Sequence, residues 1–394
     1  MKFFHIYKLK DILKLLLFIL TLVILLTFSK ENLESVFEST TLFLQSVFPS
    51  LFPFILFTNV ILNTNITDMI DKIIGKPLSF IFCIPKISSI AIITGFLCGF
   101  PMGAKSISSL YAENKIDYTT AKKLLSFVNN CNPSFVLSTI GISMFMNLKV
   151  GILLLTSHYI SSIIIGICYT RLNSSLIIHE NVDFLNSNIK KSDKIKTKND
   201  NFFNIIKKGI QNTFISLGGI LGFIIIFNLL FRIIRIYLIK FNVSETVIAV
   251  ISAIFEVTKG CKEISMLDTD ITFKIILASF ALGFSGLCIL AQIYSTISDF
   301  KFSFLNIVMP KFVQGIISAI VTYILITFTN IFDISTLSVF NNTNLSYSNY
   351  LTKEYLIFLS IMTTIVFFLI ISLRLDNHKK SSPKTTLLKK GGKL

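Results

Sequence analysis

Apolar residues run along this chain in stretches long enough to cross a lipid bilayer. A helix of about 20 apolar residues spans the hydrocarbon core of a membrane. The apolar segments are 12–28, 41–62, 87–111, 124–146, 150–170, 211–231, 245–257, 274–298, 312–330 and 355–373, of which 245–257 is too short to span. This pattern predicts an all-α polytopic membrane protein.

Polar and helix-breaking residues interrupt the third segment in the stretch GFPMGAK. Gly99, Pro101, Gly103 and Lys105 stand where a spanning helix would be apolar. Proline and glycine can open the backbone toward a ligand, because a break in lipid is tolerated only against protein or a water-filled cavity. Two small residues four apart can also form a seam for close helix packing. Pro101 and Lys105 favour a broken element, in which Lys105 faces the interior or extends to an interface.

A second interruption is the stretch NNCNP, which begins with Asn129 and Asn130 and ends with Pro133. Its amides supply several donors and acceptors, and Ser134 can cap the helix that follows. Because the flanking sequences are helical and apolar, we expect a re-entrant hairpin with the asparagines at its tip. A turn at the membrane surface is the alternative.

Two ionisable residues lie within or beside other apolar runs. Glu256, in AIFEVTKG, can pair with Lys259, bind a coupling cation or proton, or sit at the membrane interface. His158 is interpreted as a buried, hydrogen-bonded histidine in preference to a proton relay.

The hydrophilic stretch 171–203 divides the chain into two halves that resemble each other. Residues 95–108 align with residues 283–295, which places Gln292 opposite Lys105. Interrupted segments in corresponding positions of two halves indicate the binding site of a transporter. We therefore include Gln292 among the candidate substrate-binding residues.

Positive charge gathers at both ends of the chain and in the middle loop, and the net charge is +16. The loop 331–352 has no lysine or arginine, so the positive-inside rule places it outside and both termini in the cytoplasm. Basic residues in short loops do not form the folded basic face of a nucleic-acid-binding protein. The predicted organisation is an anchor helix (1–40), a first repeat with re-entrant elements (41–170), a basic cytoplasmic loop (171–203), a second repeat (204–330), an external loop with the last transmembrane helix (331–374) and a basic tail (375–394).

Enzyme and metal signatures are missing from the sequence. The six cysteines form no CxxC pair, the four histidines share no ligand spacing, and no phosphate loop, HExxH or GxSxG motif is present. We expect no enzymatic activity, no cofactor and no metal site.

Three motifs in combination resemble the YlbJ-type sporulation integral membrane proteins of the nucleoside-recognition (Gate) domain group. They are GFLCGFPMGAKSISSLY, LLSFVNNCNPSFVLSTIGISMF and FEVTKG. The resemblance implies a fold similar to concentrative nucleoside transporters, with two repeats and paired re-entrant hairpins. It also implies a role in spore formation, in the outer forespore membrane, moving dipicolinic acid out of the mother cell toward the forespore.

By the same resemblance, the substrate region comprises the matching motif positions. These are residues 99–105, Asn129, Asn130, Pro133 and Glu256. Cys131 and Asn132 depart from the small residues that the family more often has after the asparagine pair. A nucleoside carrier and a non-transporting scaffold of the sporulation membrane remain alternatives. Membrane lipid and a small organic anion are the expected partners, and a homo-oligomer or sporulation membrane partners stay open.

Overall fold

Helices form all the regular structure in the part of the chain that the computed structural model describes, which is residues 15, 19, 23, 26–62, 66–172, 202–298, 300 and 302–328. Within these residues, five helices are long and apolar enough to cross a membrane, or six if a bent pair of helices is one span. The all-α polytopic fold is confirmed. The predicted last transmembrane helix, the external loop, the basic tail and nearly all of the middle loop and first apolar segment lie outside the described residues.

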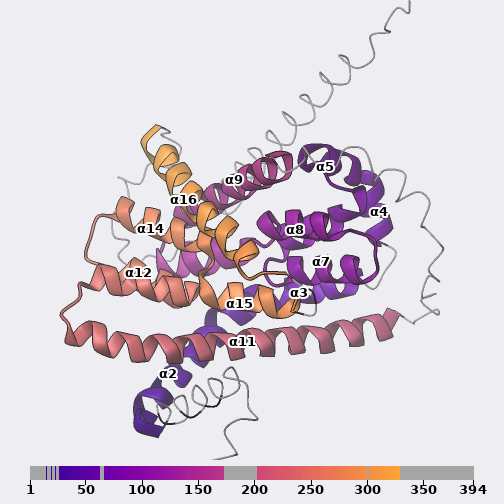
Figure 1. Cartoon of the computed structure of the whole chain (residues 1–394). Helices are drawn as coiled ribbons and strands as arrows, with labels where there is room; N and C mark the ends of the chain where they lie inside the picture. The colour runs from indigo at the N-terminus through magenta and orange to yellow at the C-terminus, as the bar shows by residue number, and fades with distance from the viewer. Residues whose placement is uncertain are drawn as a thin grey trace, which may run out of the picture.

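The first half of the chain contains short helices followed by one long helix (Figure 1). Its elements are α2 (Ser29–Leu42), η2 (Phe43–Val47), α3 (Phe48–Leu62), α4 (Ile66–Ile73), α5 (Gly75–Phe82), η3 (Lys86–Ser88), α6 (Ser89–Leu97), α7 (Met102–Ala112), α8 (Tyr118–Phe127), η4 (Phe135–Met144) and α9 (Leu148–Leu172). The second half has α11 (Phe202–Lys240), α12 (Glu245–Phe255), α13 (Val257–Met266), α14 (Ile271–Phe284), α15 (Gly286–Thr296) and α16 (Leu305–Phe328).

Each half contains a hairpin of two short helices that pack against each other, α6 with α7 and α12 with α13. Small residues allow the close approach in both hairpins. A Cβ atom on Gly103 would lie 3.0 Å from Cα of Gly95, and one on Gly260 would lie 2.1 Å from Cα of Ala253. Neither of these hairpins lies at the asparagine stretch, where the sequence analysis expected one.

The asparagine break is not the tip of a hairpin. Helices α8 and η4 lie end to end along α9. At the end of α8, Ser162 of α9 donates to the carbonyl of Phe127 (2.7 Å), and in η4 a Cβ atom on Gly141 would lie 2.6 Å from Cα of Gly151 of α9. The 25 residues of α9 are long enough to support both pieces. The expected hairpin is therefore wrong at this motif: residues 128–134 interrupt one broken helix.

Helices α14 and α15 form the corresponding broken helix of the second half and pack against α16. Ser279 and Ser318 hydrogen-bond to each other (2.8 Å), and the rings of Tyr294 and Phe304 meet 5.4 Å apart. The two long helices α9 and α16 also pack together, with α8 against α16 and α14 against α9.

This packing corrects the internal alignment proposed from the sequence. Each half runs hairpin, broken helix, long helix, so the hairpin α6–α7 corresponds to α12–α13. The break at Gly99 therefore matches the tip at Glu256, and the break at Gly286 matches the asparagine stretch. The earlier pairing of residues 95–108 with 283–295 joined a hairpin to a broken helix, because both contain glycine and serine in apolar surroundings.

Helix α2 turns polar residues inward and apolar residues outward. Asn32, Ser35 and Ser39 are buried, whereas Leu33 and Phe37 are 73% exposed. The helix continues through η2 into α3, and Ser29–Ile61 forms one span of 33 residues, so no break separates an anchor from a first repeat at residue 40. Both α2 and α3 pack against α11, the longest helix in Figure 1.

Candidate functional site

The break between α6 and α7 packs directly on the asparagine break. The amide of Phe100 donates to the carbonyl of Asn130 (3.0 Å), and Asn132 Nδ2 donates to the carbonyl of Leu97 (3.1 Å). Gly99 has φ +78°, and a Cβ atom there would lie 2.8 Å from the amide nitrogen of Asn132. Glycine is needed at this position both for its conformation and for the close backbone approach.

Gly99 and Gly103 combine the two roles considered from the sequence, a helix break and a seam for close packing. Gly99 lies in the break itself, just before Pro101, and Gly103 lies in the packing seam with Gly95. A Cβ on Gly103 would also lie 3.0 Å from Oδ1 of Asn129. The glycines therefore open one helix and allow the asparagine break to approach it.

Asn132 caps the helix after the asparagine break. Its Oδ1 accepts from the amides of Ser134 (2.8 Å) and Phe135 (3.3 Å), and Pro133 occupies the first turn, where no amide donor is needed. The predicted cap by Ser134 is wrong: its side chain makes no capping bond, since its backbone is already helical.

Lys311, which the sequence pattern does not mark as a candidate site residue, is fully buried. Its Nζ atom donates to the backbone carbonyl of Asn129 and to Oε1 of Gln314 (2.7 Å). Within the described residues no carboxylate forms an ion pair with it. The residue was overlooked because it stands beside Pro310 at the edge of the apolar segment, and only the helix shows that it lies inside.

Gln314 connects this lysine to the asparagine break and to α9. Its Nε2 donates to Oδ1 of Asn130 (3.2 Å) and to the carbonyl of His158 (3.4 Å). His158 Nε2 accepts from the amide of Cys131 (3.1 Å), so the prediction of a buried, hydrogen-bonded histidine is confirmed. We call Asn129, Asn130, His158, Lys311 and Gln314 the central polar cluster.

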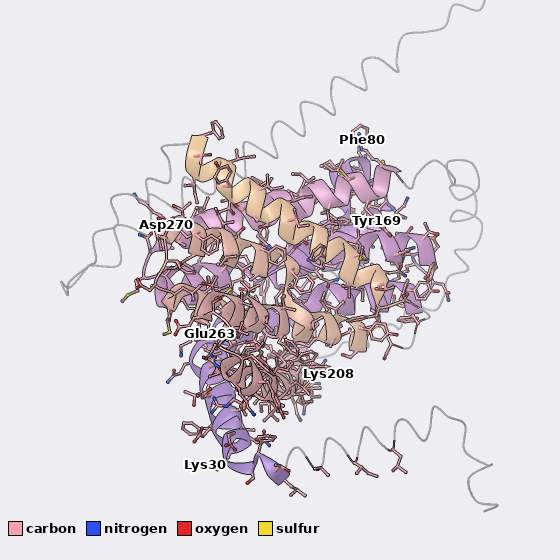
Figure 2. All side chains as sticks on the ribbon, turned by 60° about the vertical axis from the view of Figure 1, so that its left-hand side comes forward. Lys30, Phe80, Tyr169, Lys208, Glu263 and Asp270 are labelled. Carbon is pink, nitrogen blue, oxygen red and sulfur yellow. The ribbon has the colours of Figure 1, made fainter. Side chains whose placement is uncertain are left out.

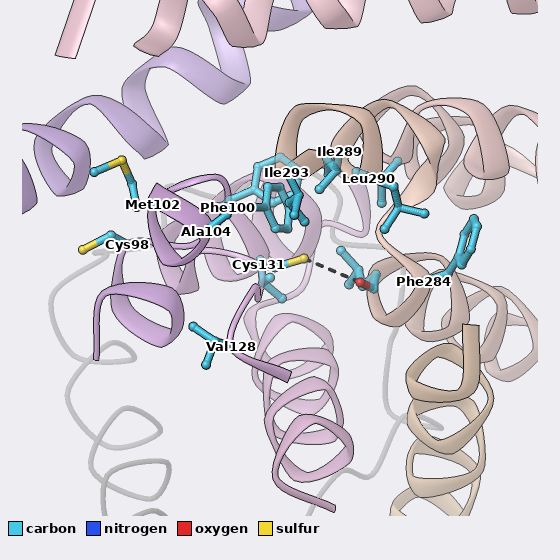
Figure 3. Packing of buried hydrophobic residues seen from close by; sticks show 14 of the residues in the cluster. Cys98, Phe100, Met102, Ala104, Val128, Cys131, Phe284, Ile289, Leu290 and Ile293 are labelled. Atoms are coloured by element: carbon cyan, nitrogen blue, oxygen red, sulfur yellow. Dashed lines mark hydrogen bonds between the residues drawn. The ribbon is translucent and has the colours of Figure 1, made fainter. Parts of the chain in front are cut away.

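The broken helix of the second half, α14–α15, also contacts the asparagine break. Sγ of Cys131 lies 3.7 Å from the carbonyl oxygen of Leu282, the contact drawn as a dashed line in Figure 3. Leu282 lies near the end of α14, where Ser285 and Gly286 adopt positive φ angles. The breaks of both halves thus meet at the central polar cluster.

Several polar atoms of the cluster have no partner in the described part of the chain. They are Nδ2 and Oδ1 of Asn129 and Nδ1 of His158, all fully buried. Buried polar groups in folded proteins are nearly always hydrogen-bonded. An amide donor and acceptor left open beside a buried lysine are suited to a polar ligand.

Glu256 lies at the tip of the second hairpin and is 2% exposed. Its carboxylate accepts from the amides of Thr258 (2.9 Å) and Lys259 (2.7 Å), the first turn of α13. Negative charge is favourable at a helix N-terminus. The side chain of Lys259 forms an ion pair with Glu38 instead (3.3 Å), so the predicted pairing of Glu256 with Lys259 is not found.

The structure does not bring every predicted residue to the cluster. Lys105 is half-buried, and its Nζ donates to Oδ1 of Asn59 on α3 (3.3 Å). Gln292 is buried on α15, where its Nε2 donates to Sγ of Cys288 (3.3 Å). The contacts of both residues lie outside the central polar cluster.

The chain is 25% identical over 301 residues to the sporulation integral membrane protein YlbJ of Bacillus subtilis (strain 168). The aligned region covers 71% of this chain and 74% of that protein. No protein-family model matches the chain, and no solved structure matches it. With its apolar helices, this chain is a multi-pass integral membrane protein that is similar to this sporulation protein.

Proposed function

We propose that this protein carries a small organic anion across the membrane and that its substrate is dipicolinic acid. The observation that supports this most is Lys311, a lysine buried with no carboxylate partner among the described residues, where the helix breaks of both halves meet. A buried charge is expensive unless it is paired. An anionic substrate would supply the missing charge.

The geometry around Lys311 suits a carboxylate. Its ammonium group has three donors, of which two are used by Asn129 and Gln314. The third donor and the open Nδ2 of Asn129 could bind one carboxylate through charge-assisted hydrogen bonds. Dipicolinate carries two carboxylates on a planar ring. The similar protein of Bacillus subtilis is named as a sporulation protein, which is the process in which we propose that this chain acts.

Carriage across the membrane requires the buried cluster to open. The broken helices and hairpins that surround it are the elements from which transporters build midplane sites, with one repeat moving against the other. We place the protein in the outer forespore membrane with both termini in the cytoplasm, so that substrate leaves the mother cell. No chemical conversion of the substrate is part of this proposal.

The test is uptake into proteoliposomes that hold the purified protein. Radiolabelled dipicolinate is compared with picolinate, which has one carboxylate fewer, and with uridine. Saturable uptake of dipicolinate, weaker for picolinate and absent for uridine, supports the proposal. Uptake of uridine alone would support a nucleoside carrier, and uptake of none by folded protein would favour a scaffold.

A further inference from the structure

The second arm of the α12–α13 hairpin is tied to two neighbouring helices by ion pairs. Lys259 Nζ lies 3.3 Å from Oε2 of Glu38 on α2, and Glu263 forms an ion pair with Arg235 on α11. Both bonds leave the same helix, α13, one turn apart. Glu263 lies on the side of the molecule from which α2 extends toward Lys30 (Figure 2).

Lys259 connects this outer contact with the hairpin tip. Its backbone amide donates to Oε2 of Glu256, while its side chain reaches Glu38. The ammonium side chain is 13% exposed and Glu38 is 55% exposed, so the bond runs from the interior to the surface. Any movement that lifts the tip must break or stretch this bond.

The first hairpin is held differently. Among the described residues, its arms α6 and α7 form no ion pair with another element, and Lys105 is bonded to the neutral side chain of Asn59. The two halves therefore have the same order of helices, but among the described residues only the second hairpin is bound to neighbouring helices by ion pairs.

We propose that Lys259–Glu38 and Glu263–Arg235 form a latch that holds the α12–α13 hairpin closed against the break between α14 and α15, where a Cβ atom on Gly286 would lie 3.0 Å from the carbonyl oxygen of Ala253. Opening the latch frees α13 from α2 and α11 and exposes the hairpin's inner face. The purpose of this motion rests on the proposed function, since it would admit the substrate. The latch itself is tested without any substrate.

A buried cysteine on the hairpin reports the opening. Cys261 lies on α13, two residues after Lys259, and is 0% exposed. The exposed Cys83 and Cys168 are replaced by serine, and the full chain in liposomes is treated with a charged methanethiosulfonate reagent. Mass spectrometry of the Cys261 peptide then gives the labelling rate.

The structure offers a matched control on the same helices. Arg232 of α11 and Glu34 of α2 form an ion pair at 3.2 Å that does not involve α13. We expect K259Q and E38Q each to raise the Cys261 labelling rate about twofold to fivefold, since an ion pair at a protein surface contributes about 1 kcal/mol or less. We expect E34Q and R232Q to leave the rate unchanged.

The charge-exchanged variant E38K/K259E separates a latch from misfolding. Restoring the ion pair with reversed charges should return labelling toward the parent rate. Equal labelling in all variants, or an equal rise in the control variants, would overturn the latch. Faster labelling in K259Q together with no dipicolinate uptake by the parent would keep the latch and reject the proposed substrate.

Discussion

The Nζ atom of Lys311 is hydrogen-bonded to the backbone carbonyl of Asn129, which lies 182 residues earlier in the chain. This bond joins the long helix of the second half to the broken helix of the first. It exists because the asparagine break leaves a carbonyl free of helical bonding, so an interior cation can use it.

Replacing Lys311 by methionine should abolish anion uptake, with a loss of about 100-fold or more, because charge-assisted hydrogen bonds are among the strongest in proteins. Methionine keeps the length and apolar volume of the buried side chain. The measurement is dipicolinate uptake per inserted protein. Lys105→Met is the matched control, and it should retain most uptake since Lys105 bonds to Asn59. Equal losses in both variants would contradict the assignment.

Asn129→Asp should abolish uptake while the protein still folds. The change adds a negative charge to the residue whose backbone carbonyl binds Lys311, so it would repel a carboxylate substrate. Asn129→Ala, which removes the amide without adding charge, should lose less, about tenfold. Uptake and thermal unfolding in detergent are measured together. A normal uptake rate in Asn129→Asp would show that the open amide does not face the substrate.

Gly95→Ala should destabilise the protein by about 2 kcal/mol or more, because overpacking a tight contact forces the backbone to shift. A Cβ on Gly95 would lie 2.0 Å from the carbonyl oxygen of Val128. Gly218 on α11 has nothing within 4 Å of its Cβ position, so Gly218→Ala is the control and should be neutral or slightly stabilising. Thermal unfolding in detergent distinguishes the two.

Glu256→Ala should lower stability by about 1–3 kcal/mol, since two amides at the start of α13 lose their acceptor inside the protein. Glu256→Gln keeps one acceptor oxygen and should lose less. The same two variants separate capping from cation coupling. If Glu256→Gln unfolds like the parent but loses uptake driven by an ion gradient, the carboxylate has a role beyond capping.

The sequence was sufficient to locate two of the places where helices break. Proline, glycine and clustered amides cannot continue an apolar helix, so the breaks at Gly99 and at Asn129–Pro133 follow from local chemistry, whereas the break at Glu256 has no such residue at it. Sequence could not distinguish a hairpin from a broken helix. That distinction depends on whether the two pieces pack on each other or along a third helix, which hydropathy does not record.

Lys311 shows the same limit for the candidate site. A lysine at the start of an apolar segment has the same pattern whether it extends to water or lies inside. Its burial is decided by α9 and α14, which pack against α16. The sequence signal for a buried lysine here is the proline next to it, Pro310, within a helical run. The same combination occurs at Pro101 and Lys105, four residues apart. Lys105 carried that signal more clearly but lies away from the cluster.

The most direct test is equilibrium binding of radiolabelled dipicolinate to the purified protein, measured for the parent, Lys311→Met and Lys105→Met. Binding does not require a coupling ion or a partner, so it isolates the central polar cluster. We predict saturable binding to the parent and to Lys105→Met, and none to Lys311→Met that retains the parent's thermal unfolding. Unchanged affinity in Lys311→Met would contradict the claim that this lysine binds the anion.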